Sequence, residues 1–525
     1  MAGCRQPIHM VFEPVHEHDD RPYTWVGDWA GRRASLTPDA PSLTEVSIGR
    51  TWTYAELDER AHRAACMLRD YGIETGDRVA VVARNRIEYV DLFHATGKLN
   101  AILAPISFRL SPQTIAELLD LVDPTLIVIE DRFAHLLDRY DADTEILRLD
   151  DESDRAIDGV RYGKALPENI TTVEQVRSSL ADPHLLLHTG GTTGTPKETV
   201  ITHGSILWNS VNTITGWGLR PDDVTPMVFP FFHTGGWNVL TVPFFHMGGH
   251  VIIDREVNPG DILTTIDSYE STVLVAVPAV LRSMTTHERW DETDLSTLRF
   301  VKSGGGPCRE SVIEAWRSRE VDLSQGYGLT ECGPNNFGMP PEGGASHPTS
   351  VGRPMPHVDM RVVAEDGEVV KPDTIGELEL ASPHAADRYW RNPDETETTF
   401  GDGWVSTGDL ASVDEEGYVY IEGRKKHMFI SGGENIYPVE VEDAIAEHPQ
   451  VEEVVVIGID DEDWGEVGMA IVQGSDTFEL ADLRDFLDGR LARYKHPRVL
   501  HFVDEMPTSG PDKIDRQALR DRFVG

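Results

Sequence analysis

The chain has 525 residues, several times the size of a typical domain, so it can bury a large core and should divide into at least two units. Apolar residues make up 40% of it and aromatic residues 8%, which excludes a disordered protein. The 89 acidic and 47 basic residues give a net charge of −42, which argues against general affinity for nucleic acid or anionic membranes because both would repel the protein.

The N-terminal half alternates helical and strand patterns. Apolar side chains recur every three or four residues over 54–71, which predicts an amphipathic helix that ends at Gly72. A second helix is predicted at 112–121, and buried strands at 78–83, 126–130, 251–253, 273–277 and 300–301. This alternation predicts the α/β class, with helices packed around layered, largely parallel sheets.

The pattern changes twice toward the C-terminus. From about residue 358 to 421, alternating apolar and charged residues predict a subdomain of short antiparallel strands. Beyond residue 424 the predicted elements are helices at 439–447 and 480–494, strands at 451–459 and 499–503, and a final helix. We therefore predict a large N-terminal domain, residues 1–424, and a small α+β C-terminal domain, residues 425–525.

The most informative segment for function is an apolar strand that runs into a loop of glycines, threonines and one lysine. Residues 185–197 read LLLHTGGTTGTPK. Glycines let backbone N–H groups approach a phosphate, threonine hydroxyls add donors and Lys197 adds a positive charge. The spacing of a Walker loop is absent, since Pro196 precedes Lys197 and Glu198 follows it. The segment predicts a phosphate-binding loop of another kind; the alternative is an ordinary turn.

Six motifs in order resemble those of the adenylate-forming (AMP-binding) superfamily, which includes acyl-CoA synthetases, luciferases and the adenylation domains of peptide synthetases. The motifs are TGGTTGTPK at 189–197, GYGLTE at 326–331, STGD at 406–409, GRKK at 423–426, GGENIYP at 432–438 and a terminal lysine, Lys513. Six ordered motifs leave little room for coincidence, and the resemblance covers nearly the whole chain.

The resemblance implies an ATP- and Mg²⁺-dependent acid–CoA ligase. Such an enzyme converts a carboxylic acid to an acyl-adenylate with release of pyrophosphate, then passes the acyl group to coenzyme A, which gives acyl-CoA and AMP. Adenylation makes AMP the leaving group in place of oxide. Because the transition state carries charge on the phosphates, positioning and electrostatic stabilisation should supply the catalysis, without a general base.

The resemblance assigns the phosphate site to two motifs. Thr192, Thr193 and Lys197 would hold the β- and γ-phosphates, and Glu331 would bind Mg²⁺ together with those phosphates. With Lys513, the residues Thr192, Lys197 and Glu331 form the predicted catalytic set. The rest of the loop would line the nucleotide through Thr189, Gly190, Gly191 and Gly194.

The nucleoside site is assigned in the same way. Tyr327 would stack on the adenine, Asp409 would accept the ribose hydroxyls and Arg424 would lie beside them. Glycines on the other side of the base would allow its close approach, although such a run is also typical of a plain turn. The remaining residues of this predicted site are Gly304, Gly305, Gly306, Gly326, Gly328 and Thr330.

The resemblance makes the C-terminal domain a mobile cap. It would rotate between the two half-reactions about a hinge at Lys426. Lys513 would bridge the substrate carboxylate and the α-phosphate during adenylation. The segment that would line the pantetheine tunnel afterwards consists of Ser431, Gly432, Gly433 and Glu434.

The acyl pocket is expected near the segment 230–237. His233 would border the acyl channel, or would be a core histidine, and Gly235 and Trp237 would lie beside it. Gly328 stands where acetate-activating relatives carry tryptophan, which makes acetate and propionate poor candidates because a small acid would leave the pocket unfilled. A medium- or long-chain fatty, branched or aromatic acid is the predicted substrate.

Five positions depart from the family's usual residues. Gly190 replaces a serine, Glu198 a glycine, His427 an aspartate, and Arg388 and Asp512 replace glycines. None of these changes removes a charge that the mechanism requires. Asp512 places a negative charge beside Lys513.

The sequence also bears on the cellular environment. Only nine of the basic residues are lysines, and this acidic, lysine-poor composition resembles that of cytosolic proteins from halophilic archaea, so we expect that origin and a salt requirement. Cys4, Cys66, Cys308 and Cys332 are scattered and are expected to be reduced. The absence of a signal peptide or a long apolar segment predicts a cytoplasmic protein without integral membrane association.

Two alternatives stay open. The acyl group could pass to the thiol of a carrier protein instead of coenzyme A, because both acceptors share the pantetheine arm. A non-catalytic nucleotide-binding relative is disfavoured by the presence of Glu331 and Lys513. The expected partners are the carboxylic acid, ATP and coenzyme A, among them biosynthetic acids such as succinylbenzoate, and a homo-oligomer is one alternative to a monomer.

Overall fold

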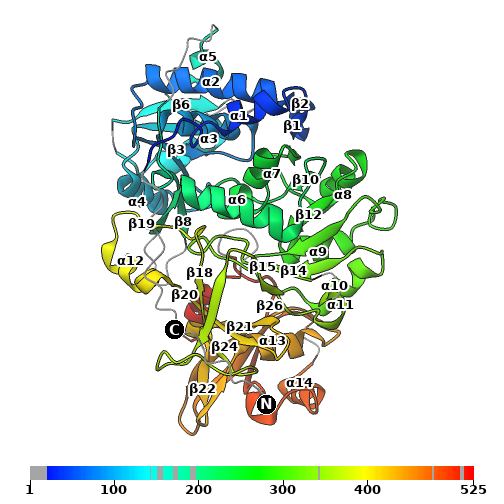
Figure 1. The fold of residues 1–525 in the computed structure, drawn as a ribbon. Coiled ribbons are helices and arrows are strands. Elements are labelled where there is room, and N and C mark those ends of the chain that lie inside the picture. The colour runs from blue at the N-terminus through cyan, green and yellow to red at the C-terminus, as the bar shows by residue number, and fades with distance from the viewer. Residues whose placement is uncertain are drawn as a thin grey trace, which may run out of the picture.

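The computed structural model of the protein describes residues 21–141, 143–149, 158–168, 176–189, 197–340, 343–475, 478–508 and 514–524. A large N-terminal domain fills the upper part of Figure 1, and a smaller C-terminal domain lies below it. A band of antiparallel strands lies between the two (Figure 1). The predicted fold class, a large α/β domain with a smaller α+β domain, is confirmed.

An eight-stranded mixed sheet forms the centre of the N-terminal domain. Its strands, in spatial order, are β19 (Arg388–Tyr389), β9 (Lys197–Thr202), β8 (Pro183–Thr189), β4 (Ile102–Pro105), β3 (Arg78–Val82), β5 (Leu126–Glu130), β6 (Glu145–Leu149) and β7 (Val160–Arg161). The neighbours from β8 to β7 are parallel, as the βα pattern predicts, whereas β9 is antiparallel to both β8 and β19.

Helices pack on this sheet, and their ends follow local sequence signals. The longest, α2, begins after Thr53, whose hydroxyl accepts from the N–H of Glu56 while the Glu56 carboxylate accepts from the N–H of Thr53. Ser111 caps α4 with its hydroxyl alone, which accepts from the N–H of Thr114, and Pro112 lies in the first turn of that helix. The helices of this region are α1 (Trp29–Leu36), α2 (Tyr54–Asp70), α3 (Ile87–Leu99), α4 (Pro112–Val122), α5 (Tyr162–Ala165) and α6 (His203–Trp217).

Two smaller sheets complete the α/β part. The first has the order β10 (Val224–Met227), β11 (His250–Ile253), β1 (Pro41–Glu45) and β2 (Arg50–Thr53). The second is parallel throughout and consists of β12 (Val273–Ala276), β13 (Phe300–Ser303) and β14 (Leu323–Gln325). Their helices are α7 (Thr241–Met247), α8 (Pro259–Ser268), α9 (Pro278–Thr285) and α10 (Glu310–Arg317). Each strand predicted in this region is present.

The predicted antiparallel subdomain is a four-stranded sheet. Its order is β17 (Asp359–Val363), β18 (Gly376–Ala381), β20 (Val405–Val413) and β21 (Val419–Arg424). A two-stranded ribbon precedes it, formed by β15 (Phe337–Gly338) and β16 (Arg353–Pro354). The short helices α11 (Gly343–Ser346) and α12 (Pro393–Thr399) lie in the connections.

The described part of the C-terminal domain has a five-stranded sheet and three α-helices. The strands are β22 (Phe429–Ser431), β23 (Glu434–Ile436), β24 (Val451–Asp461), β25 (Gly465–Gly474) and β26 (Val499–Val503), and the helices are α13 (Pro438–Ala446), α14 (Leu480–Leu487) and α15 (Arg516–Phe523). The helix predicted over 480–494 was too long, because α14 ends at Leu487 and Gly489 follows with a left-handed φ of 82°.

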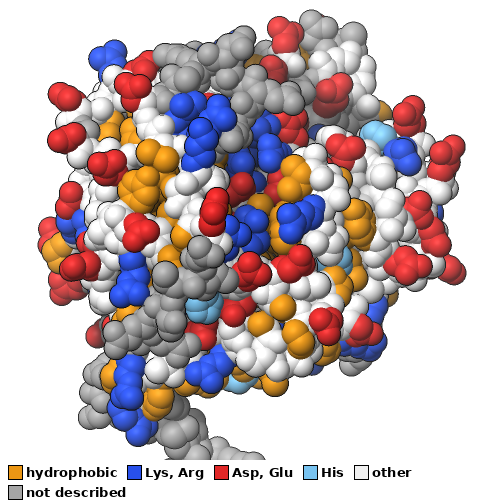
Figure 2. Space-filling view, turned by 90° about the horizontal axis from the view of Figure 1, so that it is seen from above, with side chains coloured by type: hydrophobic (Ala, Val, Ile, Leu, Met, Phe, Trp, Pro, Cys, Tyr) orange, Lys and Arg blue, Asp and Glu red, His pale blue; other side chains and the backbone are white. Residues whose placement is uncertain are grey.

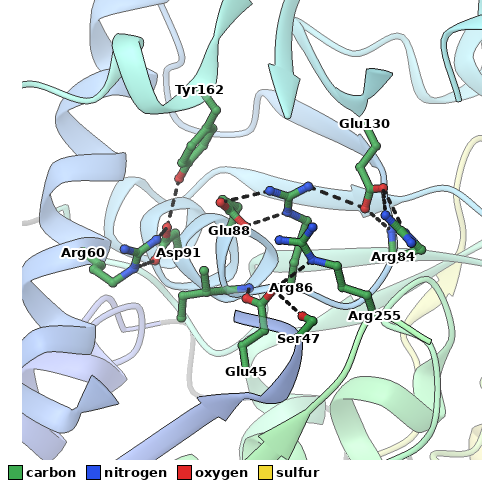
Figure 3. Close-up of polar contacts among 11 residues, drawn as sticks. Glu45, Ser47, Arg60, Arg84, Arg86, Glu88, Asp91, Glu130, Tyr162 and Arg255 are labelled. Atoms are coloured by element: carbon green, nitrogen blue, oxygen red, sulfur yellow. Dashed lines mark hydrogen bonds and ion pairs between the residues drawn. The ribbon is translucent and has the colours of Figure 1, made fainter. Parts of the chain in front are cut away.

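Buried carboxylates lie where the eight-stranded sheet meets the sheet that contains β1 and β11 (Figure 3). Glu45, at the end of β1, is fully buried and accepts from the N–H of Ile87 and from Arg255 Nε, each at 3.0 Å. Glu130, at the end of β5, is also fully buried and accepts from the N–H of Arg84 at 2.9 Å and its Nε at 3.0 Å. Because a buried carboxylate is costly without such partners, these contacts hold the strand ends in one arrangement.

Two arginines connect the domains. Arg282 of α9 and Arg309, just before α10, donate to the backbone carbonyl of Glu452 at 2.9 and 3.0 Å. Arg309 also donates to Glu453 Oε1 at 2.7 Å. Since Arg309 closely follows the glycines 304–306, the C-terminal domain docks beside the predicted adenine site.

The surface carries most of the acidic excess. Figure 2 shows acidic side chains around the rim of one face and basic side chains gathered nearer its middle. Among the described residues, no helix is long and apolar enough to cross a membrane. Cys66, Cys308 and Cys332 are buried, and Cys308 and Cys332 form no disulfide among the described residues, in agreement with the expectation that they are reduced.

Candidate functional site

The glycine and threonine loop connects two antiparallel strands. Thr189 at the end of β8 pairs directly with Lys197 at the start of β9, so the loop closes a hairpin. The loop residues Gly190, Gly191, Thr192, Thr193 and Gly194 lie outside the described residues. A Walker loop leads from a strand into a helix, and the hairpin connection therefore distinguishes this segment from that motif.

Lys197 lies between a carboxylate and an aromatic ring. Its Nζ is 2.6 Å from Oε2 of Glu395, in the first turn of α12, and 5.3 Å from the centre of the Tyr389 ring. The lysine side chain is only 10% exposed. A partly desolvated ammonium group next to the loop is well placed to bind phosphate.

Tyr389 links this lysine to the predicted magnesium ligand. Its hydroxyl donates to Oε1 of Glu331 at 2.8 Å. Burial raises the pKa of Tyr389, and the negative charge of Glu331 raises it further, so the phenol stays protonated. Sequence reasoning missed the contact, although Tyr389 directly follows the unusual Arg388.

The residues around Glu331 fit a magnesium ion that is held mainly by nucleotide phosphates. Within the described ranges, no three histidine, cysteine or acidic residues are grouped as a metal centre would require. Mg²⁺ commonly takes one or two carboxylates plus phosphates and water. Glu331 supplies such a carboxylate within the group that contains Lys197 and Tyr389.

The predicted adenine site lies at the carboxyl ends of β13 and β14, where ligands commonly bind to parallel sheets. The N–H of Gly326 donates to the carbonyl of Ser303 at 2.7 Å, which brings the two strand ends together. A Cβ added to Gly304 or Gly306 would meet no atom within 4 Å, so open space adjoins these glycines. The structure thus leaves room for a planar base on this side.

The residues predicted to bind the nucleoside meet across two sheets. Asp409 of β20 pairs in register with Arg424 of β21, and Arg424 Nε lies 2.6 Å from Asp409 Oδ1. The hydroxyl of Tyr327, which follows β14, donates to Asp409 Oδ2 at 2.6 Å. Asp409 is 4% exposed. Burial and the charge of Asp409 both raise the pKa of Tyr327 well above its usual value. Thr330, predicted in the same site, is buried.

The predicted acyl-pocket residues have different environments. His233 is exposed, which contradicts the alternative of a core histidine, and its Nδ1 accepts from the N–H of Gly235 at 3.0 Å. Trp237 is fully buried and stacks on Phe231 at 4.4 Å, within the hydrophobic core. A Cβ at Gly328 would lie 2.2 Å from the carbonyl oxygen of Pro334. This glycine therefore permits close approach of two backbone segments, and a larger residue would displace one of them.

The residues predicted to form the hinge and the pantetheine tunnel lie at the start of the C-terminal domain. Lys426 is exposed in a 3₁₀ turn, Lys425–His427, between β21 and β22. Ser431 is buried and Glu434 exposed, and between them Gly432 and Gly433 have left-handed φ values of 61° and 87°. Lys513 and Asp512 lie outside the described residues.

A buried acid next to Lys197 is the main feature that sequence reasoning did not develop. Glu198 is fully buried, and neither carboxylate oxygen has a hydrogen-bond partner in the described part of the chain. Its cross-strand neighbours are His188 on β8 and Trp390 beside β19, and His188 Nδ1 and Trp390 Nε1 are likewise unpartnered there. Burial raises the pKa of Glu198 well above its usual value.

Comparisons with known proteins agree with this geometry. The family model "AMP-binding enzyme" matches residues 31–390, and "AMP-binding enzyme C-terminal domain" matches residues 440–513. The feruloyl-CoA synthase of Amycolatopsis sp is 34% identical over 500 residues, covering 95% of this chain and 99% of that protein. The indoleacetate–CoA ligase of Aromatoleum aromaticum is 33% identical over 504 residues, covering 94% and 97%.

A solved structure shows the same fold. The anthranilate–CoA ligase in complex with anthranoyl-AMP matches with a TM-score of 0.87 and 25% identity, over 95% of this chain and 97% of that one. The motif resemblance is thus confirmed, whereas the halophilic archaeal origin stays a prediction. Because the family models and relatives together cover most of its length, the chain belongs to the AMP-binding enzyme family.

Proposed function

We propose that the protein is an ATP-dependent acid–CoA ligase that works through an acyl-adenylate. One observation carries the proposal: the segment 326–331 contributes to two polar groups at once. Its Tyr327 contacts Asp409, and its Glu331 contacts Tyr389, whose ring lies beside Lys197. This arrangement suits a nucleoside at one end of the segment and a polyphosphate at the other.

The proposed roles follow from charge and geometry. Asp409 and Arg424 would bind the ribose, and Tyr327 with Gly304, Gly305 and Gly306 would enclose the adenine. Lys197 would offset charge on the phosphates, the threonines of the loop would donate hydrogen bonds to them, and Glu331 would bind Mg²⁺. The bound magnesium would stabilise charge on the departing pyrophosphate.

The C-terminal domain would supply the remaining groups. We place its boundary after residue 424, with a hinge at Lys426, and Lys513 would bridge the acid and the α-phosphate. Ser431, Gly432, Gly433 and Glu434 would line the path of the pantetheine arm. Coenzyme A is the proposed acceptor, and the thiol of a carrier protein is the alternative.

An aromatic acid is the substrate class that we favour. The two relatives above are named for feruloyl and indoleacetate substrates, and the matched structure contains anthranoyl-AMP. Fatty and branched acids are the competing class. We further propose a cytoplasmic protein that needs high salt, in keeping with its charge of −42.

Pyrophosphate release tests the proposal. The full chain with ATP and Mg²⁺ in molar salt should release pyrophosphate only when an acid is added, and an aromatic acid should be turned over faster than octanoate or acetate. Acyl-CoA should form when coenzyme A is present. If no acid in a broad panel triggers release, the enzyme class is wrong. Adenylate formation without any acyl-CoA would instead favour a carrier-protein acceptor.

A further inference from the structure

Two protein donors hold Asp409, the proposed ribose ligand, through different oxygens. The Tyr327 hydroxyl donates to Oδ2 at 2.6 Å, and Arg424 Nε lies 2.6 Å from Oδ1. Rotation of the carboxylate about its Cβ–Cγ bond would lengthen both contacts. The orientation of the carboxylate plane is therefore fixed by contacts within the protein.

This orientation matters for a ribose because its 2′ and 3′ hydroxyls are adjacent. A carboxylate can accept about four hydrogen bonds, so each of its oxygens can bind more than one donor. A fixed carboxylate can then accept both hydroxyls without losing rotational freedom on binding. Preorganisation of this kind raises affinity by lowering the entropic cost.

The phenol is itself held in place by other contacts. The neighbouring Gly326 donates its N–H to Ser303, and the carbonyl of Tyr327 accepts from the N–H of Asn336 at 3.2 Å. The ring packs edge-on against Phe337, with ring centres 5.8 Å apart. The hydroxyl position is thus set by backbone and ring packing, and Asp409 is held against it.

We propose that the hydroxyl of Tyr327 is a positioning group for Asp409 and gives the site its preference for nucleotides with an intact ribose. The inference rests on the proposed function and adds to it a task for the hydroxyl that is separate from any contact of the ring with the base. Burial raises the pKa of Tyr327, so the phenol remains a donor at neutral pH.

Equilibrium binding separates the two tasks of the tyrosine. We would measure the affinities of AMP and 2′,3′-dideoxy-AMP for the full chain by calorimetry, in wild type and in Tyr327→Phe. The phenylalanine keeps the ring and removes only the hydroxyl. We expect AMP to bind about tenfold more weakly to the variant, the effect of losing a hydrogen bond to a charged group, and dideoxy-AMP to bind within about twofold of wild type.

A double-mutant cycle adds a second readout. Asp409→Asn should reduce the preference for AMP over dideoxy-AMP, and Tyr327→Phe should then have little further effect in that background, since both changes act through one contact. Tyr54→Phe is a matched control, because it removes another buried hydroxyl that donates to the carbonyl of Gly249 at 2.6 Å. It should leave the ratio of the two affinities unchanged.

The outcomes distinguish this inference from the proposed function. If Tyr327→Phe weakens both nucleotides equally, the hydroxyl acts on the fold or the base, and the inference is wrong. Unchanged AMP affinity in Tyr327→Phe, or additive effects in the cycle, would also overturn it while leaving the function intact. A wild-type protein that binds neither nucleotide would overturn the proposed function, and the inference with it.

Discussion

Tyr389 donates a hydrogen bond to Glu331 at 2.8 Å while its ring lies 5.3 Å from the ammonium group of Lys197. One side chain therefore supports the proposed magnesium ligand and the proposed phosphate ligand, which come from distant parts of the sequence. The two contacts use different parts of the tyrosine, the hydroxyl and the ring face, so substitutions can separate them.

Tyr389→Phe should impair the use of magnesium more than the binding of nucleotide. The variant keeps the ring beside Lys197 but loses the bond that orients Glu331. We expect the Mg²⁺ concentration for half-maximal pyrophosphate release to rise several-fold, and ATP affinity measured by calorimetry without metal to stay near wild type. Tyr389→Leu, which also removes the ring, should weaken metal-free ATP binding as well. An unchanged Mg²⁺ requirement in the phenylalanine variant would show that the hydroxyl bond has no such role.

Glu395→Gln should strengthen ATP binding. The Glu395 carboxylate lies 2.6 Å from Lys197 Nζ, so it competes with the phosphates for the lysine and repels them. Because Glu395 is 37% exposed and partly screened, we expect a modest, two- to fivefold fall in the KM for ATP, with little change in kcat. An increase in KM would mean that the carboxylate helps to position Lys197 for the nucleotide.

Glu198→Gln should stabilise the protein increasingly as pH rises. Burial raises the pKa of Glu198 in the folded state, so the unfolded chain releases this proton first and wild-type stability falls as pH rises above about 4.3. Glutamine has no such loss, and the difference should grow by about 1.4 kcal/mol per pH unit until the folded-state pKa is reached. Urea denaturation at pH 5 and pH 8 measures it.

Glu59→Gln provides the control for that series, because Glu59 is an exposed acid on α2. Its effect on the free energy of unfolding should stay small, because the side chain is exposed. A Glu198→Gln protein with the same pH dependence as wild type would show that Glu198 is ionised in the folded state.

The buried histidines should make the protein sensitive to acid. Burial lowers the pKa of His184, His188, His246 and His250 to about 4, and that of His94 and His384 to about 3. The unfolded chain protonates histidine near pH 6.5, so the stability these groups contribute is complete above that pH and is lost as pH falls from about 6.5 toward 4. Each of these histidines changes the free energy of unfolding by up to about 1.4 kcal/mol per pH unit.

Urea denaturation at a series of pH values from 7.5 to 5, at constant salt, measures this loss of unfolding free energy. His184→Gln should take up about one proton fewer on unfolding than wild type at pH 5. Equal stability at pH 7 and pH 5 would contradict the prediction, as would an unchanged proton uptake in the variant.

Glu130→Ala should destabilise the protein where the ends of the neighbouring strands β3 and β5 meet. The substitution leaves Arg84 without its fully buried partner, and breaking a buried ion pair typically costs about 3–5 kcal/mol. Glu256→Ala is a matched control, because Glu256 contacts the same arginine at 3.0 Å from a position that is 73% exposed. It should change the free energy of unfolding by no more than about 1 kcal/mol. Similar losses of unfolding free energy in the two variants would contradict the prediction that the buried Glu130 contributes more to stability than the exposed Glu256.

The sequence by itself determined the elements whose signals are local. The helix over 54–71 and the strand at 126–130 agree with α2 and β5, because apolar periodicity and end signals such as the Thr53 cap act within a few residues. The family also followed from the sequence, since short motifs keep their order and spacing. The helix predicted over 480–494 failed at its end, where a single glycine conformation stops the chain.

Only the tertiary structure decided which side chains meet. Tyr389 and Glu331 are 58 positions apart, and Tyr327 and Asp409 are 82 apart, so no local pattern predicts their hydrogen bonds. Sheet pairing also decided that the phosphate loop closes a hairpin and that Glu198 is buried. The physical reason is that strand register and packing depend on contacts between distant segments, whereas helix periodicity and turn chemistry depend on neighbours in the chain.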